Sequence, residues 1–74
     1  MHVTIKLFAT LQQGRFHEKT IEITKGASVD DIRKMLKISK KEKLVILLNG
    51  RHAELHTKVK DGDILAIFPQ IGGG

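Results

Sequence analysis

The chain has 74 residues, a formal net charge of +5 and no cysteine. The absence of cysteine excludes disulfide bonds, thiolate zinc sites and a cysteine nucleophile, and no apolar run approaches the roughly 18 residues of a membrane-spanning helix. We therefore expect a soluble cytoplasmic protein without a membrane segment or a leader peptide.

Two alternating segments begin the chain. Residues 2–8, HVTIKLF, alternate in polarity as a half-buried strand does, with an inward face formed by Val3, Ile5 and Leu7. A loop around Gly14 leads to a second alternating segment, FHEKTIEIT at 16–24, which directs Ile21 and Ile23 inward. The short connection predicts an antiparallel hairpin.

The period changes to that of a helix after Gly26. Ser28 is a favourable N-cap, and Asp30 and Asp31 bring negative charge to the first turn. A single apolar stripe follows, formed by Val29, Ile32, Met35 and Leu36. We expect one helix whose stripe packs against the core.

The second half of the chain predicts further strands. Residues 43–51, KLVILLNGR, indicate a strand that is buried on both faces or central in its sheet and ends at an Asn49-Gly50 turn. Residues 52–59 form a short strand or a loop. Residues 60–68, KDGDILAIF, predict a tight turn at Asp61-Gly62 and a last strand with Leu65 and Ile67 directed inward.

The order β-β-α-β-(β)-β predicts an α+β fold of the β-grasp, or ubiquitin-like, type. Its mixed sheet of four to five strands would carry one main helix packed on one face. The first and last strands would lie side by side and parallel in the centre, with the helix as part of the crossover. We expect a single β-grasp domain over residues 1–71 and a flexible C-terminal glycine tail at 72–74.

Basic residues gather around the end of the predicted helix, at Arg33, Lys34, Lys37, Lys40, Lys41 and Lys43. The chain has no Tyr or Trp, and no aromatic residue in this segment could stack on a base. A solvated basic helix end, favoured by the helix dipole, is therefore a better interpretation than an RNA surface. Such a patch would also steer an acidic protein partner.

No constellation of residues indicates an active site of the chain's own. His52 and His56 are four residues apart, but the segment HAELH is not H-E-x-x-H and lacks a helical pattern. The four histidines are interpreted as exposed or edge residues, and no metal site is predicted. No glycine-rich loop precedes a helix to cradle a phosphate. We expect neither enzymatic activity nor a bound cofactor.

The chain ends in AIFPQIGGG. Pro69 cannot donate a hydrogen bond to a neighbouring strand, so it is expected to end strand pairing and to stiffen the exit. Consecutive glycines can enter a channel that any Cβ would block. The terminal carboxylate of Gly74 is inert at neutral pH until it is activated, so the tail indicates a second protein that uses ATP.

Strand alternation also places Phe8, Phe16 and Phe68 on the sheet face that the helix does not cover. Exposed aromatic side chains near a mobile tail suggest a docking patch for a partner. Alternatively, a bulge shifts the alternation and Phe16 joins the core.

Three segments, IKLFATL at 5–11, VILLNGR at 45–51 and DGDILAIFPQIGGG at 61–74, together resemble the ThiS/MoaD family of ubiquitin-like sulfur carriers. The similarity covers nearly the whole chain and is closer to the molybdopterin synthase small-subunit branch. It implies that a partner related to ubiquitin-activating enzymes uses ATP to adenylate Gly74. The adenylate would become a thiocarboxylate that donates sulfur in molybdopterin biosynthesis, for a molybdenum or tungsten cofactor.

The docking patch and the resemblance together predict the partner-binding residues Phe8, Phe68, Pro69, Ile71, Gly72 and Gly73. The implied partners are the adenylyltransferase, the large subunit of molybdopterin synthase and a sulfur donor protein, with the chain monomeric when free. Gln70 replaces the second proline of the family pattern, Gln12 and Gln13 replace Arg-Glu, and a third glycine lengthens the tail.

These departures leave other functions open. One alternative is a thiamine-type or tRNA sulfur carrier, and another is a ubiquitin-like modifier joined through Gly74 to lysines of target proteins. A third alternative is a non-covalent RNA- or protein-binding module that uses the basic segment from Arg33 to Lys43.

Overall fold

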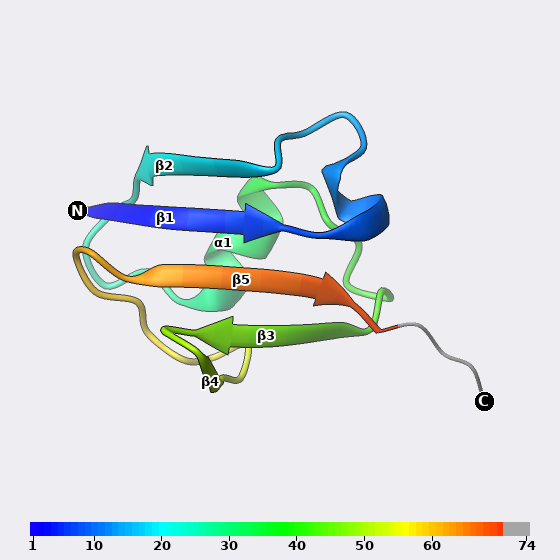
Figure 1. Ribbon diagram of the computed structural model, residues 1–74. Helices are drawn as coiled ribbons and strands as arrows, with labels where there is room; N and C mark the ends of the chain where they lie inside the picture. Colours follow the sequence, from blue (N-terminus) through cyan, green and yellow to red (C-terminus); the bar gives the residue numbers. More distant parts are fainter. Residues whose placement is uncertain (71–74) are drawn as a thin grey trace.

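A computed structural model describes residues 1–70, which form a mixed sheet with a helix across one face (Figure 1). The elements are β1 (His2–Leu7), the 3-10 helix η1 (Ala9–Gln12), β2 (Glu18–Glu22), α1 (Val29–Met35), β3 (Leu44–Leu48), β4 (Arg51–His52) and β5 (Ile64–Pro69). Within these residues the sheet has five strands in the order β2-β1-β5-β3-β4. The predicted α+β fold of the β-grasp type is confirmed.

The first and last strands form the centre of the sheet, as predicted. β1 and β5 are parallel, with Ile5 opposite Leu65 and Leu7 opposite Ile67. β2 pairs antiparallel with β1, which confirms the hairpin, and β3 pairs antiparallel with β5. Because parallel neighbours cannot be joined by a tight turn, the chain passes through α1, β3 and β4 between them.

The core lies between this central pair and α1. The side chains of Val3, Ile5, Leu7, Leu65 and Ile67 are fully buried, together with Val29 and Ile32 of the helix. The intervening strand residues are partly or fully exposed. The inward faces predicted for the first and last strands from alternation are therefore confirmed.

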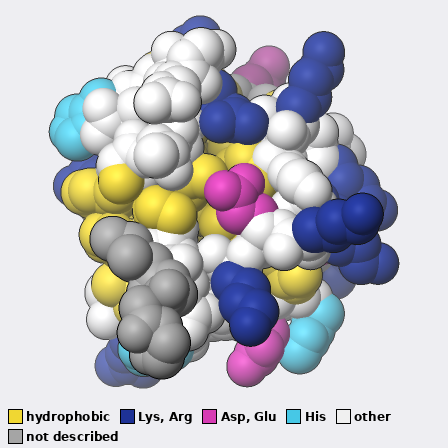
Figure 2. Space-filling model, turned by 90° about the vertical axis from the view of Figure 1, so that its right-hand side faces the viewer, with side chains coloured by type: hydrophobic (Ala, Val, Ile, Leu, Met, Phe, Trp, Pro, Cys, Tyr) yellow, Lys and Arg dark blue, Asp and Glu magenta, His cyan; other side chains and the backbone are white. Residues whose placement is uncertain are grey.

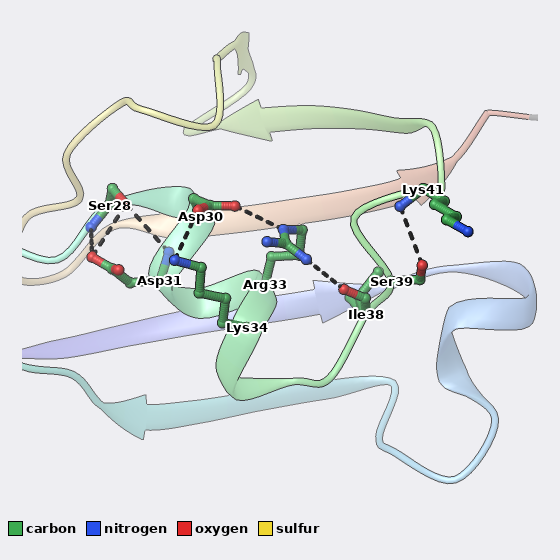
Figure 3. Close-up of polar contacts among 8 residues, drawn as sticks. All are labelled: Ser28, Asp30, Asp31, Arg33, Lys34, Ile38, Ser39 and Lys41. Carbon is green, nitrogen blue, oxygen red and sulfur yellow. Dashed lines mark hydrogen bonds and ion pairs between the residues drawn. The ribbon is translucent and has the colours of Figure 1, made fainter.

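The start of α1 follows the predicted cap. The backbone N–H of Asp31 donates to the hydroxyl of Ser28 at 3.2 Å, and the backbone N–H of Ser28 donates to the Asp31 carboxylate at 2.9 Å (Figure 3). This reciprocal pair is a capping box. The hydrogen bonds from the Ser28 backbone and hydroxyl lower the pKa of Asp31 below its ordinary value of 3.8.

The end of α1 corrects the predicted apolar stripe, because Met35 is 48% exposed. At about 3.6 residues per turn, Met35 lies about 120° around the helix from Val29. The helix ends there in a Schellman turn, with Lys37 at φ 59°, and the N–H of Ile38 donates to the Arg33 carbonyl at 3.1 Å. Ile38, which is 2% exposed, takes the next core position instead.

β3 is the strand that was predicted to be buried on both faces or central in the sheet. The structure covers it on one face only. Ile46 is its single buried residue, and the other four are partly buried. β3 lies between β5 and the two-residue β4, while α1 covers only one face of the sheet (Figure 1). The continuous apolar run therefore supplies both the core face and an apolar opposite face.

Candidate docking surface at the C-terminal end of the sheet

β5 carries the chain out of the centre of the sheet. Pairing with β3 reaches Pro69, which lies opposite Leu44, and the backbone N–H of Gln70 donates to the Lys43 carbonyl at 2.9 Å. The expectation that Pro69 ends the pairing is wrong by one residue. Alternate residues of a strand direct their N–H groups to the same side, so the missing N–H of Pro69 faces the β1 side, where β1 has already ended at Leu7.

Two aromatic rings lie beside this exit on the face opposite α1. The rings of Phe8 and Phe68 stack with centroids 4.1 Å apart and an angle of 10° between their planes. The backbone N–H of Phe8 donates to the Ile67 carbonyl at 3.2 Å, which holds the end of β1 against β5. The structure thus brings these two predicted docking residues into direct contact, next to Pro69.

Phe16 does not join them: its predicted place on the open face is wrong, and the alternative that it joins the core agrees with the structure. It is partly buried and packs against the core. The β1–β2 ladder ends at Glu18, so strand alternation no longer determines where residues 16 and 17 point.

His17 takes the place beside Phe8 instead, with the two rings edge to face and their centroids 5.9 Å apart. Its Nδ1 lies 3.1 Å from Nε2 of Gln12. The sequence pattern carried no signal for this contact.

The aromatic pair extends into a larger apolar surface that the sequence reasoning missed. Residues paired across neighbouring strands share a face, and the register places Val45 opposite Phe68 and Leu47 opposite Ala66. We call this surface the open-face patch; it consists of Phe8, Val45, Leu47, Ala66 and Phe68. Seen towards the C-terminal end of β5, hydrophobic side chains gather on one side of the view and most Lys and Arg side chains on the other (Figure 2).

Fewer basic side chains of the segment from Arg33 to Lys43 are exposed and unpaired than the sequence predicted. Arg33 is 6% exposed; its Nε donates to Asp30 Oδ1 and its Nη1 to the Ile38 carbonyl, both at 2.7 Å (Figure 3). Lys34 Nζ lies 3.5 Å from Asp30 Oδ2. The hydrogen bond from Arg33 is the largest influence that lowers the pKa of Asp30. The remaining exposed lysines are Lys37, Lys40, Lys41 and Lys43.

Four predicted site residues, Ile71, Gly72, Gly73 and Gly74, lie outside the described residues. Among residues 1–70, no helix is long and apolar enough to cross a membrane. In the same part of the chain, no three histidine, aspartate or glutamate side chains are grouped to hold a metal ion.

The central C-terminal strand, the single covering helix and the sheet order define a ubiquitin-like protein of the β-grasp class. A family profile described as the ThiS family matches residues 5–74. The chain therefore belongs to the ThiS family of small sulfur carrier proteins, which confirms the resemblance seen in the sequence. No curated protein sequence matches the chain.

Several solved structures are similar to the chain. Subunit 1 of a molybdopterin converting factor from Pyrococcus furiosus is 30% identical, with a TM-score of 0.77 and coverage of 93% of this chain and 97% of that one. Small archaeal modifier protein 1 of H. volcanii is 26% identical, with a TM-score of 0.75 and coverage of 92% and 95%. The thiamine biosynthesis protein ThiS from Geobacter metallireducens is 27% identical, with a TM-score of 0.67 and full coverage of both chains.

Proposed function

We propose that the chain is a sulfur carrier whose Gly74 carboxylate becomes a thiocarboxylate and donates its sulfur in molybdopterin biosynthesis. The observation that carries the proposal is the path of β5. Leu65 and Ile67 anchor this strand in the core, and Gln70 makes its last described sheet contact beside the open-face patch. Gly74 follows four residues later in the sequence, so the body of the protein acts as a handle for one terminal carboxylate.

The chemistry requires a separate activating enzyme. A carboxylate oxygen of Gly74 attacks the α-phosphorus of ATP, pyrophosphate leaves, and an acyl adenylate remains. A sulfur atom at the sulfide level, supplied by a sulfur donor protein, then attacks the acyl carbon and AMP leaves with the original oxygen. The chain itself binds no cofactor in this scheme. Its part is to present an unhindered glycine terminus that can enter a narrow channel.

Two features support the molybdopterin branch. Phe68 and Pro69 precede the glycine terminus, a sequence typical of that branch, and the identity with subunit 1 of the Pyrococcus converting factor is 30%. In this proposal the open-face patch, with Phe8, Phe68 and Pro69 nearest the exit, contacts first the adenylyltransferase and then the large subunit of molybdopterin synthase. Ile71, Gly72 and Gly73 enter the partner's channel.

Mass spectrometry of the intact chain tests the proposal. The chain is incubated with the adenylyltransferase of its own organism, ATP and a sulfur donor. We expect a mass increase equal to the exchange of one oxygen for one sulfur, confined to the C-terminal peptide. A chain that lacks all three terminal glycines, Gly72 to Gly74, should fold normally and show no increase, because it no longer ends in an unhindered glycine carboxylate. An unchanged mass in the wild-type chain, while an established carrier reacts in the same assay, would refute the proposal.

A protein modifier is the second candidate, favoured by the 26% identity with small archaeal modifier protein 1. The same adenylate would be attacked by the amino group of a lysine on another protein, with loss of AMP and formation of an amide. Tryptic peptides of cell extracts would then carry a remnant of the C-terminus on lysine. If such remnants are absent while thiocarboxylate accumulates, the modifier hypothesis is rejected in favour of sulfur transfer.

A further inference from the structure

Four exposed lysines follow α1 in the segment KISKKEK at 37–43. We call them the lysine face; they are Lys37, Lys40, Lys41 and Lys43. With Glu42 as the one acidic residue of the segment, the segment carries +3 of the chain's formal +5. Within residues 1–70, none of the four ammonium groups has a carboxylate within 4.0 Å, in contrast to Lys34 and Arg33.

The helix dipole accounts for Lys37, which lies in the C-terminal turn of α1, but not for the other three lysines. The basic residues in the last turn of α1 are Arg33 and Lys34, and both pair with Asp30 inside the helix. A dipole acts within about the last turn of a helix, whereas Lys40, Lys41 and Lys43 come after the buried Ile38 and the Schellman turn. A solvated helix end therefore explains the paired cations better than the lysine face.

The segment has a defined shape between two fixed points. Ile38 is buried at one end, and β3 begins at Leu44 at the other. Between them, the hydroxyl of Ser39 accepts the Lys41 N–H at 3.2 Å (Figure 3). The Ser39 carbonyl accepts the Glu42 N–H at 3.1 Å. The lysines thus project from a hydrogen-bonded turn, which fixes where their charge is presented.

The lysine face lies directly beside the exit of β5. The Lys43 carbonyl accepts the hydrogen bond from Gln70, the last described residue. In the sheet, β3 and β1 lie on the two sides of β5. The exit is therefore bordered by Lys43 before β3 on one side and by Phe8 after β1 on the other, so the two borders differ in chemistry.

We propose that the lysine face docks against an acidic surface at the rim of the channel that captures the C-terminal tail. This inference rests on the proposed function. An extended tail in a channel leaves the rest of the protein free to rotate about the tail axis. An apolar contact on one border and a charged contact on the other allow a single orientation, and charge of this kind acts mainly on the association rate. Any protein that binds the C-terminal tail must come close to Lys43, because Lys43 contacts Gln70 at the exit of β5. The partner of the lysine face is therefore expected to be an acidic protein surface, and not RNA.

Steady-state kinetics of ATP–pyrophosphate exchange test the proposal, with the adenylyltransferase of the same organism as the probe. The test variant is Lys40→Glu/Lys41→Glu, and the control of equal charge is Lys19→Glu/Lys60→Glu. Lys19 lies on β2, the sheet edge farthest from β3, and Lys60 precedes the opposite end of β5. All four side chains are exposed, so both variants should melt like the wild type.

We expect the test variant to raise the KM for the chain by about tenfold or more at low salt, in the range of electrostatic steering. The kcat should stay unchanged because the tail is intact. The difference should shrink above 0.15 M salt, where the Debye length falls below about 8 Å. The control should change KM by less than about twofold, since its charges lie away from the exit.

The possible failures are distinguishable. Equal KM changes in the test and control variants, with normal exchange by the wild-type chain, would overturn the proposed docking of the lysine face and leave the proposed function intact. No exchange with the wild-type chain would overturn the proposed function and the lysine face with it. Retention of a single-stranded RNA oligomer that is lost in Lys40→Glu/Lys41→Glu, with unchanged exchange kinetics, would assign the lysines to nucleic acid and also overturn the proposal.

Discussion

The contact between Phe8 and Phe68 can be tested by a double-mutant cycle. The perturbations are Phe8→Leu, Phe68→Leu and both together. Leucine keeps an apolar side chain at each position but removes the flat ring, so the cycle isolates the stacking from general burial. Because both rings lie on the open face, away from α1, the substitutions should leave the buried core unchanged.

The geometry sets the expected magnitude. Centroids 4.1 Å apart with planes at 10° make the rings a stacked pair, and stacked aromatic pairs contribute about 0.5–1.5 kcal/mol beyond their burial. We therefore expect a coupling free energy of about 1 kcal/mol. The unfolding free energy of each single variant should fall by about 1–2 kcal/mol, because the stacking is lost and the changed side-chain shape adds a smaller cost.

Urea unfolding of the free chain measures the cycle. With m near 1 kcal/mol/M for a small protein, each single variant should lower the midpoint by about 1–2 M. Phe68→Leu combined with Ile32→Val, a buried residue of α1 on the other side of the sheet, serves as the additive control. A coupling below about 0.3 kcal/mol between Phe8 and Phe68, which is within the scatter of additive pairs, would refute the stacked geometry.

Three further predictions concern α1. Arg33→Met should lower the unfolding free energy by about 1.5–3 kcal/mol in urea unfolding, because the Ile38 carbonyl loses its buried charged donor; a loss below about 0.5 kcal/mol would contradict this role. In the folded protein the pKa of Asp30 is lowered from 3.8. The stabilisation that ionised Asp30 contributes is therefore complete above pH 3.8 and is lost as the pH falls through the pKa of the folded state. Thermal melts of Asp30→Asn should therefore show a weaker loss of stability in acid than the wild type, and parallel pH profiles would count against it. Lys37→Gly should raise the unfolding free energy by about 0.5–1 kcal/mol by relieving φ 59°, and a destabilised variant would contradict the assigned turn.

The parts of the fold that depend on local pattern were predictable from sequence. Alternation identified the buried faces of β1 and β5, and Ser28 followed by Asp31 identified the start of α1. The order of the elements predicted the parallel central pair, because one helix in so short a chain leaves few ways to cover a sheet. None of these inferences required knowledge of a distant contact.

The errors occurred near the ends of regular elements, where helical periodicity and strand alternation no longer determine which way a side chain points. Met35 is exposed because α1 ends at a turn formed by a lysine, where no glycine marks the stop. Arg33 is buried because Asp30 and the Ile38 carbonyl satisfy its charge and hydrogen bonds. Phe16 points to the core because it lies beyond the ladder that would have fixed its side.

The same limit applied to the candidate site. Phe8 and Phe68 were identified from alternation, since each belongs to or adjoins a regular strand. The contributions of Val45 and Leu47 depend on the register of β3 against β5, which the apolar run alone does not specify. His17 reaches Phe8 from a loop, where side-chain direction follows no period.

The position of β5 between two long neighbours has a mechanical consequence. A partner that draws on the C-terminal end pulls β5 along its own axis, and the hydrogen bonds to both β1 and β3 resist at once, in shear. An edge strand such as β2 pulled sideways would instead separate one bond at a time. Under the proposed function, the end by which a partner would hold this chain is therefore joined to the part of the sheet that separates last under load.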